Sequence, residues 1–493
     1  MLPLYTRAEM RAVDRAASER YGIPSASLME SAGARATDFI VQRYRDLRDV
    51  VIVGGEGQNG GDGWVVARHL HARGIRARCV LIGSPDKVRG DARPNFDALA
   101  KLGIDVSSTL KLDGATLIVD ALFGTGLARA LEGAHAEVVQ RINDSDVAVC
   151  ALDLPSGIDA DSGQILGAAV RADVTVTFAG YKRGLFQFPG VEHAGALHVV
   201  GIGAPVPDSD VAVIETHDVA TCLPRLSRDA HKGSRGHVLV IAGSQGKTGA
   251  ALLSAIGAMR AGAGLVTIAA DRETQPVLEH KVLEVMTAQF SDAASILKLV
   301  EGKGAAVLGP GFGITEARKQ LARELARHLP VPSVLDADAL TALGGDLEQL
   351  RNAVAPRVLT PHPGEASRLL GRSTAAVQAD RYGAVRELAE RSGQVVVLKG
   401  AHTVIGSPGG SIRVCAAGTP ALGVAGTGDV LSGVMGALNV SLSPLSAAWA
   451  SVQIHALAGE IAATSDRGLL AHEVADAIPR ALERARDRAR EPA

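Results

Sequence analysis

The chain has 493 residues, enough for two to four domains at about 150 residues per domain. Hydrophobic residues make up 47% and charged residues 21%, so there is ample material for buried cores. The net charge of −2 is spread without a basic stripe, which excludes nucleic acid as an expected partner. Four cysteines are far apart and lack metal-ligand spacing, so we expect reduced core thiols in a cytoplasmic protein: Cys79, Cys150, Cys222 and Cys415.

The first half alternates helices with short apolar strands. Apolar residues at helical spacing predict helices over residues 7–20 and 26–44. A β-branched run at 50–53 predicts a buried parallel strand, and four more strands are expected at 78–83, 116–120, 147–153 and 172–178. This alternation indicates a doubly wound α/β sheet.

A glycine-rich segment, residues 54–63, follows the first buried strand. We expect it to form a loop before a helix at 64–73. It contains the spacing G-x-G-x-x-G at Gly55, Gly57 and Gly60, which is typical of dinucleotide binding. The next strand does not end in the acidic residue that would hold a ribose, so an ordinary nicotinamide redox role is disfavoured.

Polar side chains follow three of the predicted strands. Asn59 follows the strand at 50–53, and Asp120 ends the strand at 116–120. Asp153 ends the strand at 147–153, and Ser156 follows it. Each aspartate alone is most simply a turn or cap residue. Because the carboxyl ends of parallel strands meet at one edge of a sheet, we expect the four to gather there. Oxygen ligands with one or two carboxylates suit a hard cation.

These motifs resemble those of NAD(P)H-hydrate epimerase, a Rossmann-like family, over roughly residues 7–215. The resemblance is carried by residues 58–63, 120–126 and 153–157. It implies a potassium ion at Asn59, Asp120 and Ser156. It also implies that the hydrated dinucleotide contacts Gln58, Asn59, Gly60, Gly61, Asp62, Gly124, Thr125, Gly126, Leu127, Ala128, Arg129, Ala130 and Asp153.

Within that resemblance, Asp153 is the residue expected to act as general acid/base in exchanging the R and S hydrates. Lys182 follows the strand at 172–178 and could counter a phosphate. A solvated lysine is the commoner case, so Lys182 is left out of the expected site.

A connector rich in turn residues, 203–210, separates the two halves. We expect domains at residues 1–217 and 218–493, the second beginning its α/β series with a strand at 237–242. Residues 243–249 look like a P-loop, but Ile241 stands where that motif needs glycine, so a Walker site is rejected. Further strands end in polar or glycine-rich segments at 309–313, 336–338, 360–365 and 399–403.

The segment 425–433 is the strongest chemical signal in the second half. Gly426 and Gly428 precede an apolar run at 430–438 that predicts a buried helix, so they lie at an anion-attracting helix start. Asp429 falls in the first turn, where a carboxylate can deprotonate a hydroxyl that attacks a phosphoryl group. The uncharged stretch 430–454 contains five serines, which favours a buried helix pair over a membrane span.

The second half resembles the ADP/ATP-dependent NAD(P)H-hydrate dehydratase, a family with a ribokinase-like α/β fold, over about residues 225–490. The matching segments are 309–311, 360–365, 399–400 and 426–429. The resemblance implies that the S hydrate contacts Ala263, Gly311, His362 and Asp429. It implies that the adenine nucleotide contacts Lys399, Gly400, Ala401, His402, Thr403 and Gly428.

Taken together, these resemblances indicate a bifunctional repair enzyme. One half would epimerise NADHX and NADPHX, and the other would dehydrate the S form with ADP or ATP and Mg²⁺, through Asp429 as base. A homo-oligomer without membrane attachment is expected. Two alternatives remain: a ribokinase-type small-molecule kinase with a dinucleotide-binding N-terminal domain, and a module that senses dinucleotides without turnover. The charged run at 475–490 is expected to be a solvated amphipathic helix.

Overall fold

The computed structural model describes residues 1–223 and 226–488. The chain divides into two compact units, Pro3–Ser209 and Asp210–Ala493, the latter joined by Met1–Leu2. The predicted boundary after residue 217 therefore lies within the second unit, inside α7 (Thr216–Cys222). The reason is β10 (Val211–Val213), an apolar strand that pairs in parallel with β19 (Ile412–Cys415).

The first unit is built on a seven-stranded sheet in the order β4-β3-β2-β5-β6-β7-β9, in which every neighbouring pair is parallel. Its strands are β2 (Asp49–Gly54), β3 (Arg76–Leu81), β4 (Asp105–Ser107), β5 (Leu117–Ala121), β6 (Val149–Leu152), β7 (Val174–Phe178) and β9 (Ala196–Val200). Beside them, β1 (Leu2–Tyr5) pairs with β8 (Tyr181–Lys182).

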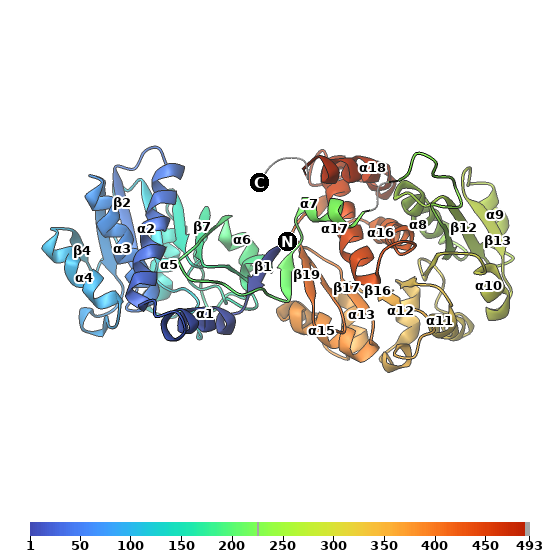
Figure 1. Ribbon diagram of the computed structural model, residues 1–493, viewed down its shortest axis with the longest axis horizontal. Coiled ribbons are helices and arrows are strands. Elements are labelled where there is room, and N and C mark those ends of the chain that lie inside the picture. The colour runs from blue at the N-terminus through green and yellow to red at the C-terminus, as the bar shows by residue number, and fades with distance from the viewer. Residues whose placement is uncertain (224–225, 489–493) are drawn as a thin grey trace. The chain divides into compact units, whose positions relative to one another are not determined.

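Helices cover both faces of this sheet. They are α1 (Arg7–Glu19), α2 (Ser25–Arg43), α3 (Gln58–Ala72), α4 (Ala92–Lys101), α5 (Ala134–Asn143) and α6 (Gly190–Ala194), with short 3₁₀ turns η1 (Pro85–Lys87) and η2 (Arg183–Phe186). Apolar side chains of α2, α3 and α4 form one core, and those of α5 form a second core with the alternate residues of the same strands. These three layers confirm the predicted Rossmann-like architecture (Figure 1).

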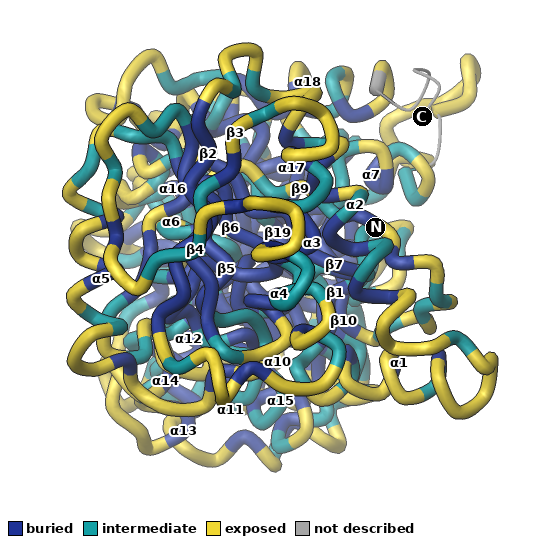
Figure 2. The backbone as a smooth tube through the Cα atoms, turned by 90° about the vertical axis from the view of Figure 1, so that its left-hand side faces the viewer, coloured by how far each residue is buried: buried dark blue, intermediate teal, exposed yellow. Residues whose placement is uncertain are grey.

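The strand order reverses between β2 and β5, because the chain proceeds outward from β2 to β4 and then returns to β5. Both strands are buried along their whole length, as their β-branched sequences predict (Figure 2). In open α/β sheets such a reversal leaves a crevice at the carboxyl ends of the two strands. Asn59 and Asp120 follow or end these two strands, so the topology itself brings them to one place.

The second unit has a larger sheet in the order β13-β12-β11-β14-β15-β16-β17-β18-β19-β10. Strands from β13 to β17 are parallel, and β18 is antiparallel to both neighbours. The strands not yet given are β11 (His237–Ile241), β12 (Leu265–Ala270), β13 (Met286–Gln289), β14 (Ala305–Leu308), β15 (Ser333–Leu335), β16 (Arg357–Leu359), β17 (Val395–Leu398) and β18 (Thr403–Gly406).

One face of this sheet packs against α8 (Thr248–Arg260), α16 (Thr427–Leu438), α17 (Pro444–Ala462) and α18 (Ala471–Arg488) in a single apolar core. Helices α11, α13 and α15 lie on the other side of the strands (Figure 1). The remaining elements are α9 (Gln275–Glu279), α10 (Ala293–Leu299), α11 (Glu316–His328), α12 (Asp338–Leu343), η3 (Glu348–Leu350), α13 (Pro363–Leu370), α14 (Thr374–Ala379), α15 (Arg381–Ser392) and η4 (Pro420–Leu422).

Helices α16 and α17 confirm the predicted buried helix pair. Among the described residues, no helix is both long and apolar enough to cross a membrane. Helix α18 covers the described part of the predicted C-terminal helix, and residues 489–490 of that prediction lie outside the described residues.

Candidate active sites

The glycine-rich segment after β2 is mostly helix, which corrects the predicted loop at 54–63. Helix α3 begins at Gln58, so residues 59–63 lie in its first two turns. The glycines here serve close packing: a Cβ on Gly60 would lie 2.1 Å from the carbonyl oxygen of Gly55. Consequently Asn59 and Asp62 are held on a rigid helix start, while Gln58 is exposed.

Asp153, Asn59 and Gly124 come together at the edge of the first sheet. A Cβ on Gly124 would lie 2.6 Å from Asp153 Oδ2 and 3.2 Å from Asn59 Oδ1, so only glycine leaves both side chains in place. The backbone N–H of Thr125 donates to Asp153 Oδ2 at 3.1 Å. Of the following predicted contacts, Gly126, Ala128, Arg129 and Ala130 are exposed, whereas Leu127 is buried in the core beneath.

Asp120 and Ser156 form a fully buried pair beside this group. Asp120 accepts hydrogen bonds from the Ser156 backbone N–H (2.8 Å), the Ser156 hydroxyl (2.6 Å) and the Leu122 N–H (3.2 Å). Burial raises the pKa of Asp120 to about 6, although these bonds oppose the rise. Asn59 is 8% exposed, and neither polar atom of its amide has a partner in the described part of the chain.

Lys182 is buried rather than solvated, which corrects the sequence-based expectation. The side chain is 1% exposed and forms an ion pair with Asp153 Oδ1. The same ammonium donates to Thr177 Oγ1 at 2.9 Å and to the Phe178 carbonyl at 2.8 Å. All three N–H groups are therefore used by the protein, so Lys182 is not placed to bind a phosphate.

In the second unit, Asp429 lies in the first turn of α16, as predicted. Gly426 caps the helix with a φ of 94°, a left-handed conformation that favours glycine. Burial and then the charge of Asp336 raise the pKa of Asp429 to about 6, and Lys399 acts in the opposite direction. The start of the helix thus combines the positive end of the helix dipole with a carboxyl group of shifted pKa, which suits catalysis on a phosphoryl group.

A polar cluster around Lys399 lies under this turn, and its carboxyl members, Asp336 and Glu365, were not assigned a role from the sequence. Asp336, 1% exposed, pairs with Lys399 Nζ at 2.7 Å and accepts the Ser432 hydroxyl at 2.6 Å. Burial opposes ionisation, but Lys399 outweighs it and holds the pKa of Asp336 below its usual value. Glu365 lies 4.0 Å from the same ammonium, and burial raises its pKa to about 7.

His362 caps α13 instead of projecting freely between its two prolines. Its ring Nδ1 accepts from the backbone N–H groups of Gly364 and Glu365, and the backbone N–H of His362 donates to Glu365 Oε2 at 2.8 Å. Burial and the nearby Lys399 lower the pKa of His362, so the ring is neutral near pH 7. About half of the side chain, 52%, remains exposed and accessible to a ligand.

The predicted nucleotide segment, Lys399 to Thr403, leaves the end of β17 beside α16. A Cβ on Gly428 would lie 3.6 Å from Lys399 Nζ, which places these two predicted contacts together. His402 has a φ of 51°, so a position that favours small, flexible residues carries an imidazole. Arg381, missed in the sequence, is buried and donates to the Leu398 carbonyl at 3.0 Å, where it supports the start of the segment.

Gly311 and Ala263, both predicted to contact the hydrate, lie at opposite ends of the strands. Gly311 lies beyond β14, where the Ser244 hydroxyl donates to its carbonyl at 2.8 Å. Ala263 is 4% exposed and precedes β12, at the amino end of the strands. Helix α8 runs between the carboxyl and amino ends of the strands, and its 13 residues span about 20 Å.

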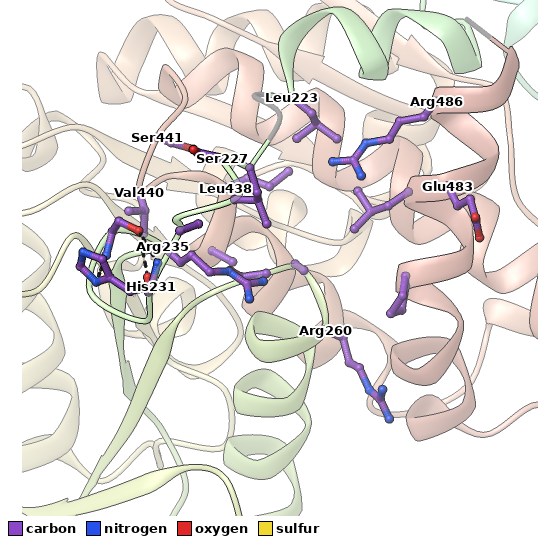
Figure 3. Close-up of a pocket in the computed structure, with 18 of the residues that line it drawn as sticks. Leu223, Ser227, His231, Arg235, Arg260, Leu438, Val440, Ser441, Glu483 and Arg486 are labelled. Atoms are coloured by element: carbon purple, nitrogen blue, oxygen red, sulfur yellow. Dashed lines mark hydrogen bonds between the residues drawn. The ribbon is translucent and has the colours of Figure 1, made fainter. Parts of the chain in front are cut away.

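A cavity of about 970 Å³ lies at that opposite end of the second unit. The neighbours of Ala263 line it, as do side chains from α8, α18 and the segment before β11, among them Arg235, Arg260 and Arg486 (Figure 3). None of the residues predicted to contact the hydrate or the nucleotide is among the described residues that line this cavity.

Comparisons with known proteins agree with the two units. The family model for NAD(P)H-hydrate dehydratase matches residues 238–480, and that for the YjeF-related protein N-terminus matches residues 25–184. The bifunctional NAD(P)H-hydrate repair enzyme of Thermofilum pendens is 39% identical over 97% of this chain and 96% of its own length. That of Escherichia coli is 34% identical over 96% of this chain and 92% of its own.

Among solved structures, a ribokinase-like superfamily protein from Enterococcus faecalis aligns with a TM-score of 0.51 at 23% identity. The alignment covers 57% of this chain and 98% of the Enterococcus faecalis protein. This likeness confirms the predicted ribokinase-like fold. With near full-length relatives above 30% identity, the chain belongs to the family of bifunctional NAD(P)H-hydrate repair enzymes, which join an epimerase domain to an ADP-dependent dehydratase domain.

Proposed function

We propose that Asp153 is the general acid/base that exchanges the R and S forms of NADHX and NADPHX in the first unit. The hydrate carries its hydroxyl on C6 of the nicotinamide ring. When the protonated hydroxyl leaves as water, the ring nitrogen supplies the electron pair that stabilises C6. Water then adds to the opposite face and loses a proton. Asp153, fixed beside the Gly124–Thr125 backbone, is placed to give and take these protons.

The remaining predicted contacts of this unit would hold the substrate around Asp153. They are the exposed start of α3 at Gln58, the helical residues Asn59 to Asp62, and the segment from Gly124 to Ala130. Leu127 would contribute only its backbone, because its side chain lies in the core.

We further propose that Asn59, Asp120 and Ser156 hold a potassium ion. The observation that supports it is the buried Asn59 amide, whose polar atoms have no partner within the described residues. A bound cation would be coordinated by the Asn59 amide oxygen and would keep Asp120 ionised. Since a carboxylate ligand must be deprotonated, K⁺ affinity should weaken as the pH falls through about 6, the pKa of Asp120.

Thermal unfolding tests the potassium site. K⁺ should raise the unfolding temperature of the first unit, and Asn59→Leu should abolish that shift. Equal shifts with K⁺ and with a tetraalkylammonium salt at the same concentration would contradict a specific site.

For the second unit we propose phosphoryl transfer from ADP to the C6 hydroxyl of the S hydrate, with Asp429 taking the hydroxyl proton. Phosphate is a far better leaving group than hydroxide. Its departure, with loss of a proton from the neighbouring ring carbon, restores the C5–C6 double bond and yields AMP and phosphate. The single observation that supports this most is that Asp429 lies in the first turn of a buried helix with a glycine cap, near Lys399 and Asp336.

In this site Gly311 and His362 would contact the hydrate, and Lys399 to Thr403 with Gly428 would contact the nucleotide. Mg²⁺ fits the same place, because it is usually held by one or two carboxylates together with substrate phosphates. Glu365, with its pKa raised to about 7, is the carboxyl group that would gain most from the ion. When bound, Mg²⁺ would offset charge on the phosphoryl group.

Product analysis tests this function against a kinase. The protein is incubated with S hydrate, ADP and Mg²⁺. A dehydratase returns the absorbance of the reduced ring and releases phosphate in equal amount. A stable phosphoester of the hydrate would identify a kinase instead, and no turnover would identify a binding module.

Finally, we propose that the protein acts in the cytoplasm as a homo-oligomer. Strand β13 is the last strand at its end of the sheet, and apolar residues on and near it are exposed: Val277, Leu283 and Met286, with Leu283 at 92%. A second copy of this chain would cover them. Light scattering should find an oligomer that Leu283→Glu dissociates, and a wild-type monomer would contradict the proposal.

A further inference from the structure

The side chain of Asp153 is held at both oxygens, by groups from different parts of the first unit. Oδ2 accepts the N–H of Thr125, and Oδ1 is paired with the ammonium of Lys182. The backbone of Asp153 is itself unusual, with a φ of 67°. A left-handed backbone is strained for a residue other than glycine, and such strain persists only where the surroundings hold it.

Lys182 reaches Asp153 through the topology of the sheet. Leu152, the residue before Asp153, is aligned with Val176 on β7, and the Asp153 N–H donates to the Val176 carbonyl at 2.7 Å. Lys182 lies on β8, a few residues beyond the end of β7. Thr177 and Phe178 on β7 complete the hydrogen bonding of its ammonium.

One more carboxyl group, Asp62 on α3, lies close enough to this ion pair to be affected by its charges. Burial and then the charge of Asp153 hold the pKa of Asp62 well above its usual value, and Lys182 acts in the opposite direction. The ammonium is bonded directly to Asp153 alone of these two carboxyl groups.

We infer that Lys182 is a positioning residue for epimerisation, which orients Asp153 without touching the substrate. This inference rests on the proposed role of Asp153. Lys182 itself is not a proton donor to the substrate, because it is 1% exposed and its three N–H groups are engaged by Asp153, Thr177 and Phe178.

The test uses the full-length protein, in which the second unit serves as an internal control. Lys182→Met keeps the volume and removes the charge. Because Lys182 acts on the position of Asp153 and not on the substrate, Lys182→Met should lower kcat for epimerisation by about tenfold or more while KM stays within about twofold of the wild-type value. Dehydration of the S hydrate should keep its wild-type rate.

Thr177→Val is the matched control, because it removes one partner of the ammonium and leaves the pair with Asp153. Its kcat and KM for epimerisation should stay close to the wild-type values. A Lys182→Met protein with wild-type kcat, or one in which KM rises while kcat is unchanged, would overturn the inference.

A double-mutant comparison separates this inference from the proposed role of Asp153. In an Asp153→Asn background, adding Lys182→Met should change the residual epimerisation rate less than twofold, because Lys182 acts through Asp153. A further large loss would show that Lys182 acts independently. If Asp153→Asn alone epimerised at the wild-type rate, the role of Asp153 would fail instead. Should Lys182→Met not fold, as judged by circular dichroism, Lys182→Gln takes its place in both experiments.

Discussion

At the scale of single residues, the environment of Asp429 makes its chemistry depend on pH. Burial and Asp336 raise its pKa to about 6. A general base must be ionised, and a carboxyl group is ionised above its pKa. We therefore expect kcat/KM for dehydration to fall about tenfold per pH unit below about pH 6, and to be level above it. A profile that rises toward low pH would contradict a base role.

Asp429→Asn removes the base without changing the shape of the side chain. Dehydration should fall by a factor of about 10²–10⁴, measured as phosphate release with S hydrate and ADP. Epimerisation by the same protein should be unchanged, because Asp153 belongs to the other unit. Equal loss of both activities would show that the effect is not local to the second site.

His402 offers a test of strain in the nucleotide segment. A left-handed backbone costs an ordinary residue about 1–2 kcal/mol and a β-branched residue more, whereas glycine adopts it freely. His402→Val should thus be less stable than His402→Gly by at least about 1 kcal/mol, measured by denaturant unfolding of the second unit. Equal stabilities would mean that the conformation at this position is not fixed.

Sequence reasoning found the site residues that belong to local motifs and missed those that depend on tertiary contacts. Asp153 follows the end of a strand and Asp429 lies in the first turn of a helix. Strand ends and helix starts can be recognised in a single sequence. Lys182 lies 29 residues from its partner, and an isolated lysine is most often solvated. One signal was available: Lys182 follows β7, and β7 pairs with β6, the strand that precedes Asp153. Asp336 was likewise seen as a strand end but not as a partner of Lys399.

At the scale of elements, α8 and α16 approach closely through glycine. A Cβ on Gly433 would lie 1.9 Å from the Ser254 carbonyl oxygen, and one on Gly257 would lie 2.5 Å from the Val430 carbonyl oxygen. The Ser254 hydroxyl also donates to the Asp429 carbonyl at 3.0 Å. The position of the Asp429 turn is therefore tied to the contact between these two helices.

Gly433→Ala should force the helices apart, destabilise the second unit by about 1–3 kcal/mol and reduce dehydration. Gly249→Ala is the control on α8, because nothing lies within 4 Å of its added Cβ. That change should stabilise the helix by about 0.5–1 kcal/mol. Thermal unfolding measures both, and a Gly433→Ala protein as stable as the wild type would contradict the packing account.

The glycines of residues 54–63 predicted a loop, whereas most of this segment is helical. Several glycines in a row usually indicate a loop. Here Gly60 and Gly63 lie inside α3 and pack against the Gly55 carbonyl and the Ala121 side chain, at distances that no Cβ could tolerate. Helix and strand types elsewhere followed the apolar periodicity, because both sheets are buried on two faces.

At the scale of the whole molecule, two candidate sites lie in two compact units of one chain. The boundary between them fell within the second unit because β10, three residues long, is too short to identify before its partner β19 is known. Ala263 was assigned to the dehydratase site by motif alone, and the fold places it at the other end of the strands. Joining the activities makes chemical sense, since only one epimer suits a stereospecific dehydratase.

The central claim is that Asp153 and Asp429 serve two separable reactions on one substrate. It is tested most directly by following the absorbance of the reduced ring in a mixture of R and S hydrate with ADP and Mg²⁺. Wild-type protein should convert the whole mixture in one phase. Asp153→Asn should convert the S fraction quickly and then slow sharply, while Asp429→Asn should restore no absorbance yet still interconvert the epimers on chromatography. Complete and rapid conversion by either variant would contradict the account.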